Sequence, residues 1–379
     1  MATGWIAEHF SKDLLADPAV RGAHDVRHEI VAVASSTSAE RAATFIKKID
    51  GPPSAAAYGS YQELVADPNV DIIHIGTPHS HHFQNAMLAI EAGKNVLCEK
   101  PLTVTASQTR KLVEAARSKG VFFLEAVWTR YFPISIKVRE LIQSGAIGTP
   151  YRTYADLSLG KDLGNGKIDF EDSHRLVSLD LAGGCILDLG VYALTWVFQT
   201  LYHLQEGDKK EAPTVVAAVN KYHTGADEMS TIICQFPKHK SMGIATTTLR
   251  LPSDIDGRHS NGPSVRIQGS KGEIHLFGHA YAPHEYRLIK SDGSTERVEY
   301  PIPKDPKRGG WGHGMFWEAD ECVRCLRDGR KESAILPWAE SIAIMEVMDA
   351  ALKQGDVEYP ELITSDTFDS NGHLNTGRK

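Results

Sequence analysis

The 379-residue sequence has few cysteines, no excess of basic charge and no long apolar run. Its five cysteines are scattered and odd in number, which argues against a disulfide framework and favours buried free thiols. A net charge of −7 gives no electrostatic basis for binding nucleic acid or an anionic membrane. No apolar run reaches the roughly 18 residues of a membrane span, and the first residues lack the order of a secretory signal. We therefore expect a cytoplasmic protein without nucleic-acid or membrane partners.

The sequence also lacks a convincing metal-ligand pattern. Cys322 and Cys325 form a single CxxC inside a helical pattern, and no second pair accompanies it. His79, His81 and His82 are clustered, but adjacent spacing at a helix start rarely lets one metal bind all three. We therefore expect no metal at either place.

The length suits two domains, and the pattern of expected secondary structure changes near residue 128. Before it, short β-branched runs at 29–35, 70–77, 94–99 and 121–128 alternate with helical patterns at 38–49, 80–92 and 105–119. This alternation predicts βαβ units and a Rossmann-like parallel sheet. Gly93 and Gly120 stand where left-handed C-caps are expected.

After residue 128 the pattern predicts helices at 133–144 and 185–202, and a strand at 151–159. Seven further strand candidates follow with short turns between them, and helices near 315–328 and 338–353 end the pattern. Many strands without intervening helices predict a C-terminal α/β domain with a large, mostly antiparallel sheet. We expect a Rossmann-like domain at 1–127, a second α/β domain at 128–363, and a polar, disordered tail at 364–379.

A degenerate dinucleotide-binding motif stands at the start of the chain. Ala2, Gly4 and Ala7 take the three small-residue positions of GxGxxG/A, and a helical pattern follows, so Gly4, Trp5 and Ile6 are expected to face a pyrophosphate. Capping of the helix by a small residue is the simpler alternative. The motif needs a central strand before it, and only Met1 precedes it.

A missing central strand would leave backbone groups of both neighbouring strands unpaired. We therefore expect a version with about five apolar residues added upstream to be more stable and to bind nucleotide better.

The end of the second strand favours NADP over NAD. It runs through Ser35 and Ser36 with no carboxylate before Glu40, and Arg41 is close by. A carboxylate here would bind the ribose 2′-hydroxyl of NAD, whereas hydroxyls or arginine suit the 2′-phosphate of NADP. The same Ser/Thr cluster also suits an N-cap for the next helix, and both roles can hold together.

Two charged residues, Glu99 and Lys100, lie at the carboxyl end of a predicted parallel strand, where open α/β sheets place their ligands. Pro101 restricts the backbone there and is compatible with a cis bond. A helix entry without function is the alternative.

Asp188 and Tyr192 are spaced i, i+4 in the predicted helix at 185–202, so they are expected on one face. A tyrosine beside an ammonium group becomes a better base, and Lys100 could supply that charge while Asp188 orients the group. The alternative for Tyr192 is a core aromatic.

These motifs resemble the glucose-fructose oxidoreductase, inositol dehydrogenase and rhizopine-catabolism (Gfo/Idh/MocA) family. The resemblance rests on Glu-Lys-Pro, on TPHSHH (77–82), on LEAVWTRYFP (124–133) and on LAGGCILDLGVY (181–192). It is strongest toward the branch of dimeric dihydrodiol dehydrogenases and fungal NADP-dependent D-xylose 1-dehydrogenases.

The resemblance implies a Rossmann domain and a C-terminal domain whose open sheet often forms a dimer. It places the catalytic lysine at Lys100 and the catalytic tyrosine at Tyr192, with Asp188 one turn before. It implies cofactor contacts from the segment that follows the third predicted strand, which would border the nicotinamide ring, and from Glu99 and Lys100. It also implies a substrate cleft lined by Trp128 and Arg130. The cofactor-binding residues of that segment are Thr77, Pro78, His79 and His82. The absent first strand and Ser36, in place of an expected arginine, depart from the family pattern.

His174 and His313 are two further candidates. His174 precedes the Tyr192 helix and could bind substrate hydroxyls, or could lie in a surface loop. His313, in the Gly-rich turn at 310–314, could border the cleft or cap the next helix.

The sequence thus predicts an NADP-dependent dehydrogenase acting on a sugar or cyclic diol, with the C1 position of D-xylose as the leading substrate. A trans-dihydrodiol dehydrogenase, a tailoring oxidoreductase of secondary metabolism and a non-catalytic NADP-binding regulator remain as alternatives.

Overall fold

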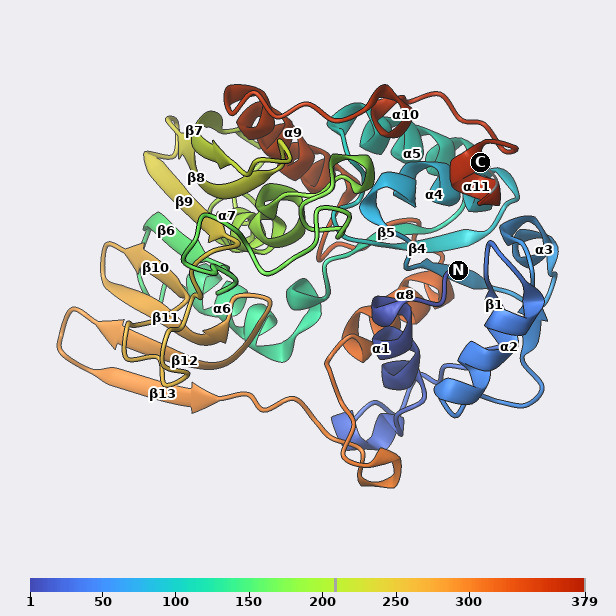
Figure 1. The fold of residues 1–379 in the computed structure, drawn as a ribbon. Helices are drawn as coiled ribbons and strands as arrows, with labels where there is room; N and C mark the ends of the chain where they lie inside the picture. Colours follow the sequence, from blue (N-terminus) through green and yellow to red (C-terminus); the bar gives the residue numbers. More distant parts are fainter. Residues whose placement is uncertain (208–209, 378–379) are drawn as a thin grey trace. The chain divides into compact units, whose positions relative to one another are not determined.

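The computed structural model describes residues 1–207 and 210–377, which form two compact units (Figure 1). The first unit comprises residues 1–128, 302–341 and the chain from 362 onward, and the second comprises residues 129–301 and 342–361. The expected division at residue 127 or 128 thus reappears, but the expected C-terminal domain at 128–363 is not one block. Residues 302–341 belong to the first unit because they form two hydrogen bonds with Phe123. The Phe123 N–H donates to the Lys331 carbonyl, and the Trp338 indole N–H donates to the Phe123 carbonyl.

The first unit contains five short parallel strands: β1 (Ala32–Ala34), β2 (Ala56–Tyr58), β3 (Ile72–Ile75), β4 (Asn95–Glu99) and β5 (Phe123–Ala126). They form two separate sheets, β1-β2 and β3-β4-β5. The predicted Rossmann-like parallel sheet is confirmed, and it is interrupted between β1 and β3.

Helices connect these strands as the βαβ pattern predicts. The connecting helices are α2 (Ala39–Lys48), α3 (Tyr61–Ala66), α4 (His82–Glu91) and α5 (Ala106–Lys119). α1 (Trp5–Leu14) precedes the first strand and α8 (Phe316–Arg327) follows much later in the chain, and 3-10 turns lie at Pro18–Arg21, His79–His81 and Pro306–Arg308. Ser38 and Thr105 cap α2 and α5 through their hydroxyl oxygens. Gly93 and Gly120 have φ of 78° and 65°, which confirms both predicted left-handed turns. The sequence pattern did not predict β2 or α3.

The polar tail is ordered as far as the structure describes it, in contrast to the expected disorder at 364–379. It carries α10 (Glu361–Thr364) and α11 (His373–Thr376). The side-chain amide of Asn85 donates to the Leu374 carbonyl over 3.0 Å, and that of Gln84 donates to the Thr367 carbonyl over 2.7 Å. Buried side-chain amides of α4 therefore bind a segment whose polar composition predicts disorder. Residues 378–379 lie outside the described residues.

The second unit is built on one eight-stranded sheet in the order β13-β12-β11-β10-β6-β9-β8-β7. All neighbours are antiparallel except β6 and β9, as the sequence predicts. The strands are β6 (Pro150–Asp156), β7 (Thr214–Lys221), β8 (Asp227–Phe236), β9 (Ser241–Thr248), β10 (Val265–Gly269), β11 (Gly272–His279), β12 (Ala282–Lys290) and β13 (Thr295–Glu299).

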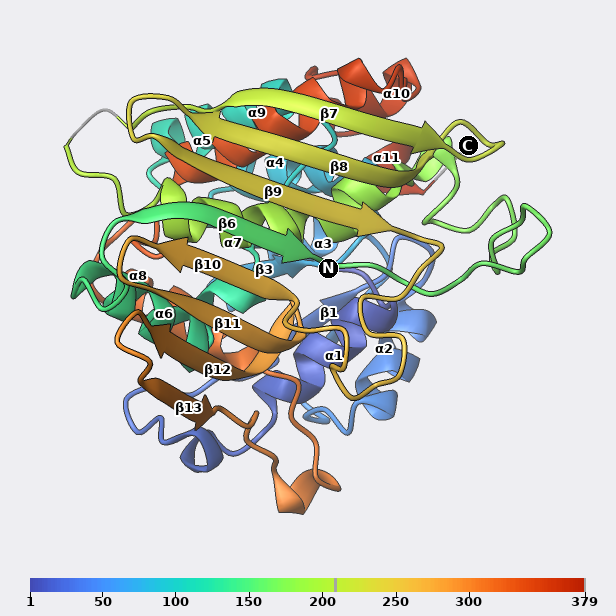
Figure 2. The ribbon, with the colours of Figure 1, turned by 90° about the vertical axis from the view of Figure 1, so that its left-hand side faces the viewer.

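Helices cover one face of this sheet and leave the other open, and Figure 2 shows the open face toward the viewer. α6 (Pro133–Gln143) packs on β12, and α7 (Val191–Leu201) packs on β6 and β9. Short helical turns at Trp128–Tyr131 and Leu179–Leu181, a π-helix at Ile186–Gly190 and α9 (Trp338–Gln354) complete the helices.

Within the described residues, one helical stretch, Leu179–Leu201, passes a length and hydropathy test for a membrane span, although no apolar run this long was expected from the sequence. Its most apolar window is 94% buried inside the protein. Trp196 and Phe198 are fully buried there, so the stretch is placed as a core helix.

Candidate active site

The amino end of α1 is open toward a ligand. Gly4 precedes the helix in an extended conformation, and no side chain caps the first turn. A Cβ added at Gly4 would meet no atom within 4 Å, and the Trp5 side chain is 63% exposed, with Ile6 half-buried behind it. Uncapped N–H groups at a helix start bind phosphate oxygens, so this turn fits the pyrophosphate of a dinucleotide.

The segment after β1 fits the ribose end of NADP. Ser35 is buried and shares a 2.9 Å hydroxyl contact with Thr37, while Ser36 is half-buried. Arg41 is exposed on α2, and its Nε donates to the Thr3 hydroxyl oxygen over 3.2 Å. The guanidinium thus spans from α2 to the glycine turn, where a 2′-phosphate would find it. Ser38 caps α2, so the cluster also performs the structural role considered above.

The segment after β3 carries a buried hydroxyl suited to a ligand. Thr77 is 7% exposed, and its hydroxyl oxygen has no hydrogen-bond partner within the described ranges. An orphaned buried polar atom of this kind is accounted for when a bound group supplies the partner. Pro78 is exposed and starts the turn that buries His79. This geometry fits the cofactor contacts that the family resemblance implies for the segment.

His82 joins this segment to the Glu-Lys-Pro turn. Its ring nitrogens lie 2.9 Å from the Thr77 carbonyl oxygen and 2.8 Å from that of Pro101. Burial lowers the pKa of His82 to about 3, so the ring is neutral near pH 7. A neutral ring has a single N–H, so it donates to one of the two carbonyls and only packs against the other. The ring is fully buried and has no exposed atom to offer a cofactor.

Glu99 and Lys100 end β4 at the edge where parallel sheets place their ligands. Glu99 is buried, and its Oε1 lies 3.1 Å from Nε2 of His74. Lys100 is half-buried, and the bond between it and Pro101 is cis.

The sequence did not single out Asp13, which ties the 311–315 segment to α1. This buried carboxylate accepts hydrogen bonds from the Trp311 indole and from the backbone N–H groups of His313 and Met315, over 2.7–2.9 Å. The segment in turn places the His313 ring on the Trp128 indole. The Gly-rich pattern at 310–314 was the signal in the sequence that pointed to this segment.

A second carboxyl that the sequence gave no sign of is Glu318 on α8. It is fully buried, and neither side-chain oxygen has a hydrogen-bond partner in the part of the chain that the structure describes. Burial, with the charges of Glu99 and Asp13, raises the pKa of Glu318 well above its usual value. The group is therefore held as a neutral acid within the first unit.

In the second unit, Asp188 and Tyr192 lie at the start of the core helix. Asp188 belongs to the π-helix and Tyr192 to α7, so the expected i, i+4 spacing crosses a change of helical phase. The Asp188 carboxylate pairs with the Arg175 guanidinium over 2.9 Å. Tyr192 is 7% exposed, and its ring centroid lies 5.9 Å from that of Tyr281.

A buried aspartate anchors this helix start. Asp227 accepts from the Ile186 N–H over 2.6 Å and lies 3.1 Å from the Cys185 sulfur. Gly184 has a φ of 134°, and a Cβ added there would stand 1.9 Å from Asp227 Oδ1. Packing therefore explains the glycine at position 184 of the AGGC sequence (182–185), since only glycine leaves room for the Asp227 carboxylate.

The two remaining substrate candidates lie in different surroundings. The His174 ring stacks on Phe170 with centroids 4.3 Å apart. It lies beside a cavity of about 1030 Å³ lined by Leu163, residues 167–175, Tyr222 and His223. Arg130 is fully buried, with its guanidinium 3.2 Å from the His203 ring. A side chain enclosed in this way does not fit the expected role of a substrate ligand, because no atom of it reaches the surface.

The structure brings the cofactor candidates together within the first unit, at the carboxyl ends of β1, β3 and β4. Lys100 belongs to that unit and Tyr192 to the other. No group of three or more potential metal ligands occurs among the described residues. All five cysteines are free and buried, which agrees with the thiols expected from the sequence.

Comparison with known proteins agrees with this arrangement. Residues 3–126 match the family described as "Oxidoreductase family, NAD-binding Rossmann fold", and residues 135–275 match the "GFO/IDH/MocA C-terminal domain". The chain is 64% identical over 380 residues to "D-xylose 1-dehydrogenase (NADP(+))" of Hypocrea jecorina, which covers 100% of this chain and 97% of the relative. It is 35% identical over 339 residues to the "Trans-1,2-dihydrobenzene-1,2-diol dehydrogenase" of Homo sapiens, covering 88% and 91%.

Among solved structures, the fold is similar to that of levoglucosan dehydrogenase in complex with NADH and levoglucosan. The TM-score is 0.75 at 18% identity, over 94% of this chain and 95% of the other. At that identity the likeness concerns the fold alone. The two family matches and the relative of 64% identity also establish the family, and the chain belongs to the Gfo/Idh/MocA oxidoreductase family.

Proposed function

We propose that this protein is an NADP-dependent dehydrogenase that oxidises the C1 hydroxyl of D-xylose or a related sugar to a lactone. The observation that carries the proposal is the 64% identity, over the whole chain, to a D-xylose 1-dehydrogenase (NADP(+)). The presence of Lys100 and Tyr192 in the sequence motifs that carry the family resemblance supports it. The dihydrodiol dehydrogenases are less similar, at 35% identity, and support a diol substrate less well.

The first unit would hold the cofactor through three features. The uncapped start of α1 at Gly4 suits the pyrophosphate, and Arg41 with Ser36 suits the 2′-phosphate. The orphaned hydroxyl of Thr77 suits a polar group near the nicotinamide. NADP, when bound, supplies the acceptor for the hydride of C1.

Residues of the chain accept the proton of the C1 hydroxyl. As the C1–H electron pair leaves, the C1–OH proton passes to the Tyr192 phenolate and the C1–O bond becomes a double bond. We propose that Lys100 supplies the ammonium charge that makes the Tyr192 phenol a usable base, since a nearby positive charge favours a phenolate. Asp188, paired with Arg175, would steady the helix start that carries the tyrosine.

The test is an assay of NADP reduction with pentoses, hexoses and trans-diols, using the variants Lys100→Met and Tyr192→Phe. We expect each variant to lose about 10²–10⁴-fold in kcat while keeping its melting temperature, and we expect Tyr192→Phe to keep its affinity for NADP. Lys119→Met and Tyr151→Phe are matched controls, because both side chains are exposed on other surfaces. Turnover that survives both variants would overturn the proposed chemistry.

A non-catalytic NADP-binding regulator is the second candidate, and the interrupted sheet of the first unit is the observation that favours it. Tight NADP binding without turnover of any sugar or diol would select this alternative. A tailoring dehydrogenase of secondary metabolism would instead turn over a diol or a larger alcohol and leave xylose untouched.

We also propose a cytoplasmic homodimer formed through the open face of the eight-stranded sheet, with no nucleic-acid or membrane partner. An apolar row crosses four strands of this face, because Val216, Ile233, Ile244 and Tyr154 are successive neighbours. Val216 is 62% exposed and Tyr154 is 38% exposed. A row of this kind is typical of an interface core. Sedimentation velocity should show a dimer that Ile244→Lys converts to monomer, while Ser294→Lys in the β12–β13 turn leaves it intact.

A further inference from the structure

The described end of the chain, residues 362–377, crosses the helices of the first unit, and we call this segment the C-terminal tail (Figure 1). Side-chain amides of α5, α4 and α3 donate to backbone carbonyls of the tail over 2.7–3.0 Å. In order along the tail, these bonds join Gln108 to Ile363 and Ser365, Gln84 to Thr367, Gln62 to Ser370, and Asn85 to Leu374. Because such a bond recurs every few residues, the tail has a fixed path over the three helices.

The tail ends its described path on two segments that carry cofactor candidates. Gly377 packs on Ser36, since a Cβ added at Gly377 would stand 3.2 Å from the Cβ, the carbonyl oxygen and the hydroxyl oxygen of Ser36. α11 packs on the 3-10 turn at His79–His81. Ser36 follows β1 and the 3-10 turn follows β3. The tail therefore links the loops that follow these two strands.

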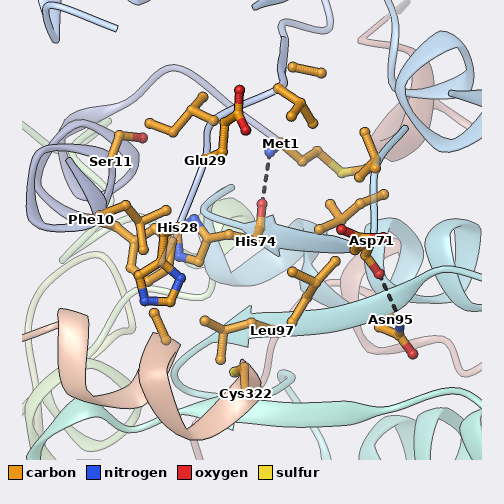
Figure 3. Close-up of a pocket in the computed structure, with 18 of the residues that line it drawn as sticks. Met1, Phe10, Ser11, His28, Glu29, Asp71, His74, Asn95, Leu97 and Cys322 are labelled. Atoms are coloured by element: carbon orange, nitrogen blue, oxygen red, sulfur yellow. Dashed lines mark hydrogen bonds between the residues drawn. The ribbon is translucent and has the colours of Figure 1, made fainter. Parts of the chain in front are cut away.

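This link matters because β1 and β3 belong to separate sheets in the described part of the chain. On the strand side, the Met1 nitrogen donates to the His74 carbonyl oxygen over 2.8 Å, as the dashed line in Figure 3 marks. The Ala2 N–H donates to the Ala34 carbonyl over 3.1 Å. The tail joins the two loops beyond the strands, so it helps to set the distance between Ser36 and the 3-10 turn.

The surroundings of Ser36 suit a phosphate group. The Tyr61 side chain, on α3, is hydrogen-bonded to that of Ser36, and the charge of Arg41 acts on the same tyrosine. Gly377 approaches from the tail, with a φ of 66° that ends α11 in a left-handed turn. Hydroxyl and guanidinium donors gathered in this way bind phosphate oxygens well. The tail thus borders the place where the 2′-phosphate of NADP fits.

We propose that the C-terminal tail forms one wall of the pocket for the 2′-phosphoadenosine half of NADP and holds Ser36 in position for the phosphate. This inference rests on the proposed function, because it takes NADP as the cofactor. Gly377 fixes Ser36 on the tail side, and α11 fixes the 3-10 turn that borders the adenosine. Coupling between two binding events is reciprocal, so bound NADP strengthens the docking of the tail as much as the docked tail strengthens NADP binding. NAD has no 2′-phosphate and gains less.

Hydrogen exchange of the full chain, measured with and without NADP, tests the coupling. The backbone N–H groups of Asn375, Thr376 and Gly377 donate within the tail, so they exchange when the tail leaves α4. We expect their exchange to slow about tenfold in the NADP complex, the usual size of one charge-assisted contact, and to slow less with NAD. The amide protons of β7 and β8, in the second unit, are the internal control.

A pair of tail variants tests the affinity. Leu374 is 7% exposed on α11, whereas Leu362 is 60% exposed on α10. Leu374→Asp places a charge against α4 and should release α11, which raises the Kd for NADP about tenfold and changes the Kd for NAD much less. Leu362→Asp adds the same charge to the same tail and should leave both constants unchanged. Titration calorimetry without sugar measures them, and thermal unfolding checks that each variant is folded.

An unchanged Kd for NADP in folded Leu374→Asp, or equal losses for NADP and NAD, would overturn the proposal. Equal exchange of the tail amide protons with and without NADP would also overturn it, and this measurement needs no variant. Because no sugar is present in either experiment, a missing dehydrogenase activity would leave these results unchanged. Failure of the proposed reaction is therefore distinguishable from failure of this inference.

Discussion

The Trp128 indole stacks on the His313 imidazole, with ring centroids 4.9 Å apart and ring planes 12° apart. The two residues are 185 positions apart, and Asp13 holds the second of them by accepting from its backbone N–H. The contact gives the tryptophan a fixed orientation within the first unit. Because Trp128 is the residue expected to line the substrate cleft, this orientation bears on substrate affinity.

Replacement of His313 by alanine is therefore expected to raise the KM for the sugar about tenfold, with a smaller change in kcat. Loss of an aromatic contact removes about 1 kcal/mol and frees the indole to rotate. Burial lowers the pKa of His313 to about 4, so the ring is neutral above pH 6 and its contribution to KM should not vary with pH there. Steady-state kinetics of His313→Ala and His313→Phe check this, and the phenylalanine form should keep most of the affinity. A pH-dependent KM that follows His313 would contradict the neutral stack.

Arg41 is expected to decide between the two nicotinamide cofactors. Arg41→Ala should raise the KM for NADP about 10–100-fold, because a charge-assisted contact to phosphate contributes roughly 1.5–3 kcal/mol. The KM for NAD should change little, since NAD has no 2′-phosphate. Lys47→Ala removes another exposed cation from α2 and is the control. Equal losses with both cofactors would show that Arg41 acts through the fold and not on the phosphate.

Gly184→Ala should destabilise the second unit. The added Cβ would overlap the Asp227 carboxylate, and the backbone there is at a φ of 134°. We expect a loss of about 3 kcal/mol or more from the strained backbone and the steric clash. Gly164→Ala is the control, because that glycine also has a positive φ but nothing lies within 4 Å of its Cβ position. Urea unfolding of both variants measures the difference, and equal losses would remove the steric argument.

Asp227→Ala is expected to cost about 1–3 kcal/mol, because it leaves the buried Ile186 N–H without its acceptor. Asp227→Asn keeps an acceptor oxygen and should retain more stability. If the aspartate also positions the helix that carries Tyr192, kcat should fall in the alanine form and recover in the asparagine form, while KM stays nearly constant. Recovery of stability without recovery of kcat would limit Asp227 to a structural role.

The Met1 amino group should make stability depend on pH. Its pKa is about 5 in the folded protein and 8.0 when unperturbed, so between these values the unfolded chain binds a proton that the folded chain does not. The free energy of unfolding from this group therefore rises with pH across that window, by up to about 1.4 kcal/mol per pH unit. Urea unfolding of the free and the amino-terminally acetylated protein isolates the effect, because acetylation removes the titration. Parallel stability curves would contradict it.

Local pattern was sufficient for most of the fold. Alternating apolar runs and turn residues predicted four of the five parallel strands, because a buried parallel strand needs continuous β-branched residues and its helix ends need caps. The same pattern missed β2, whose segment Ala56–Tyr58 is short and only half-buried, so its composition resembles a loop.

Tertiary structure decided what depends on contacts between distant segments. The return of residues 302–341 to the first unit rests on bonds to Phe123, and the order of the tail rests on Gln84 and Asn85, none of which has a local signature. The burial of Arg130 and the neutral acid at Glu318 arise from what surrounds each side chain. A sequence specifies its own periodicity, turns and caps, because these are short-range. Whether a side chain is enclosed, which groups it bonds to and whether it is protonated depend on residues that only folding brings near.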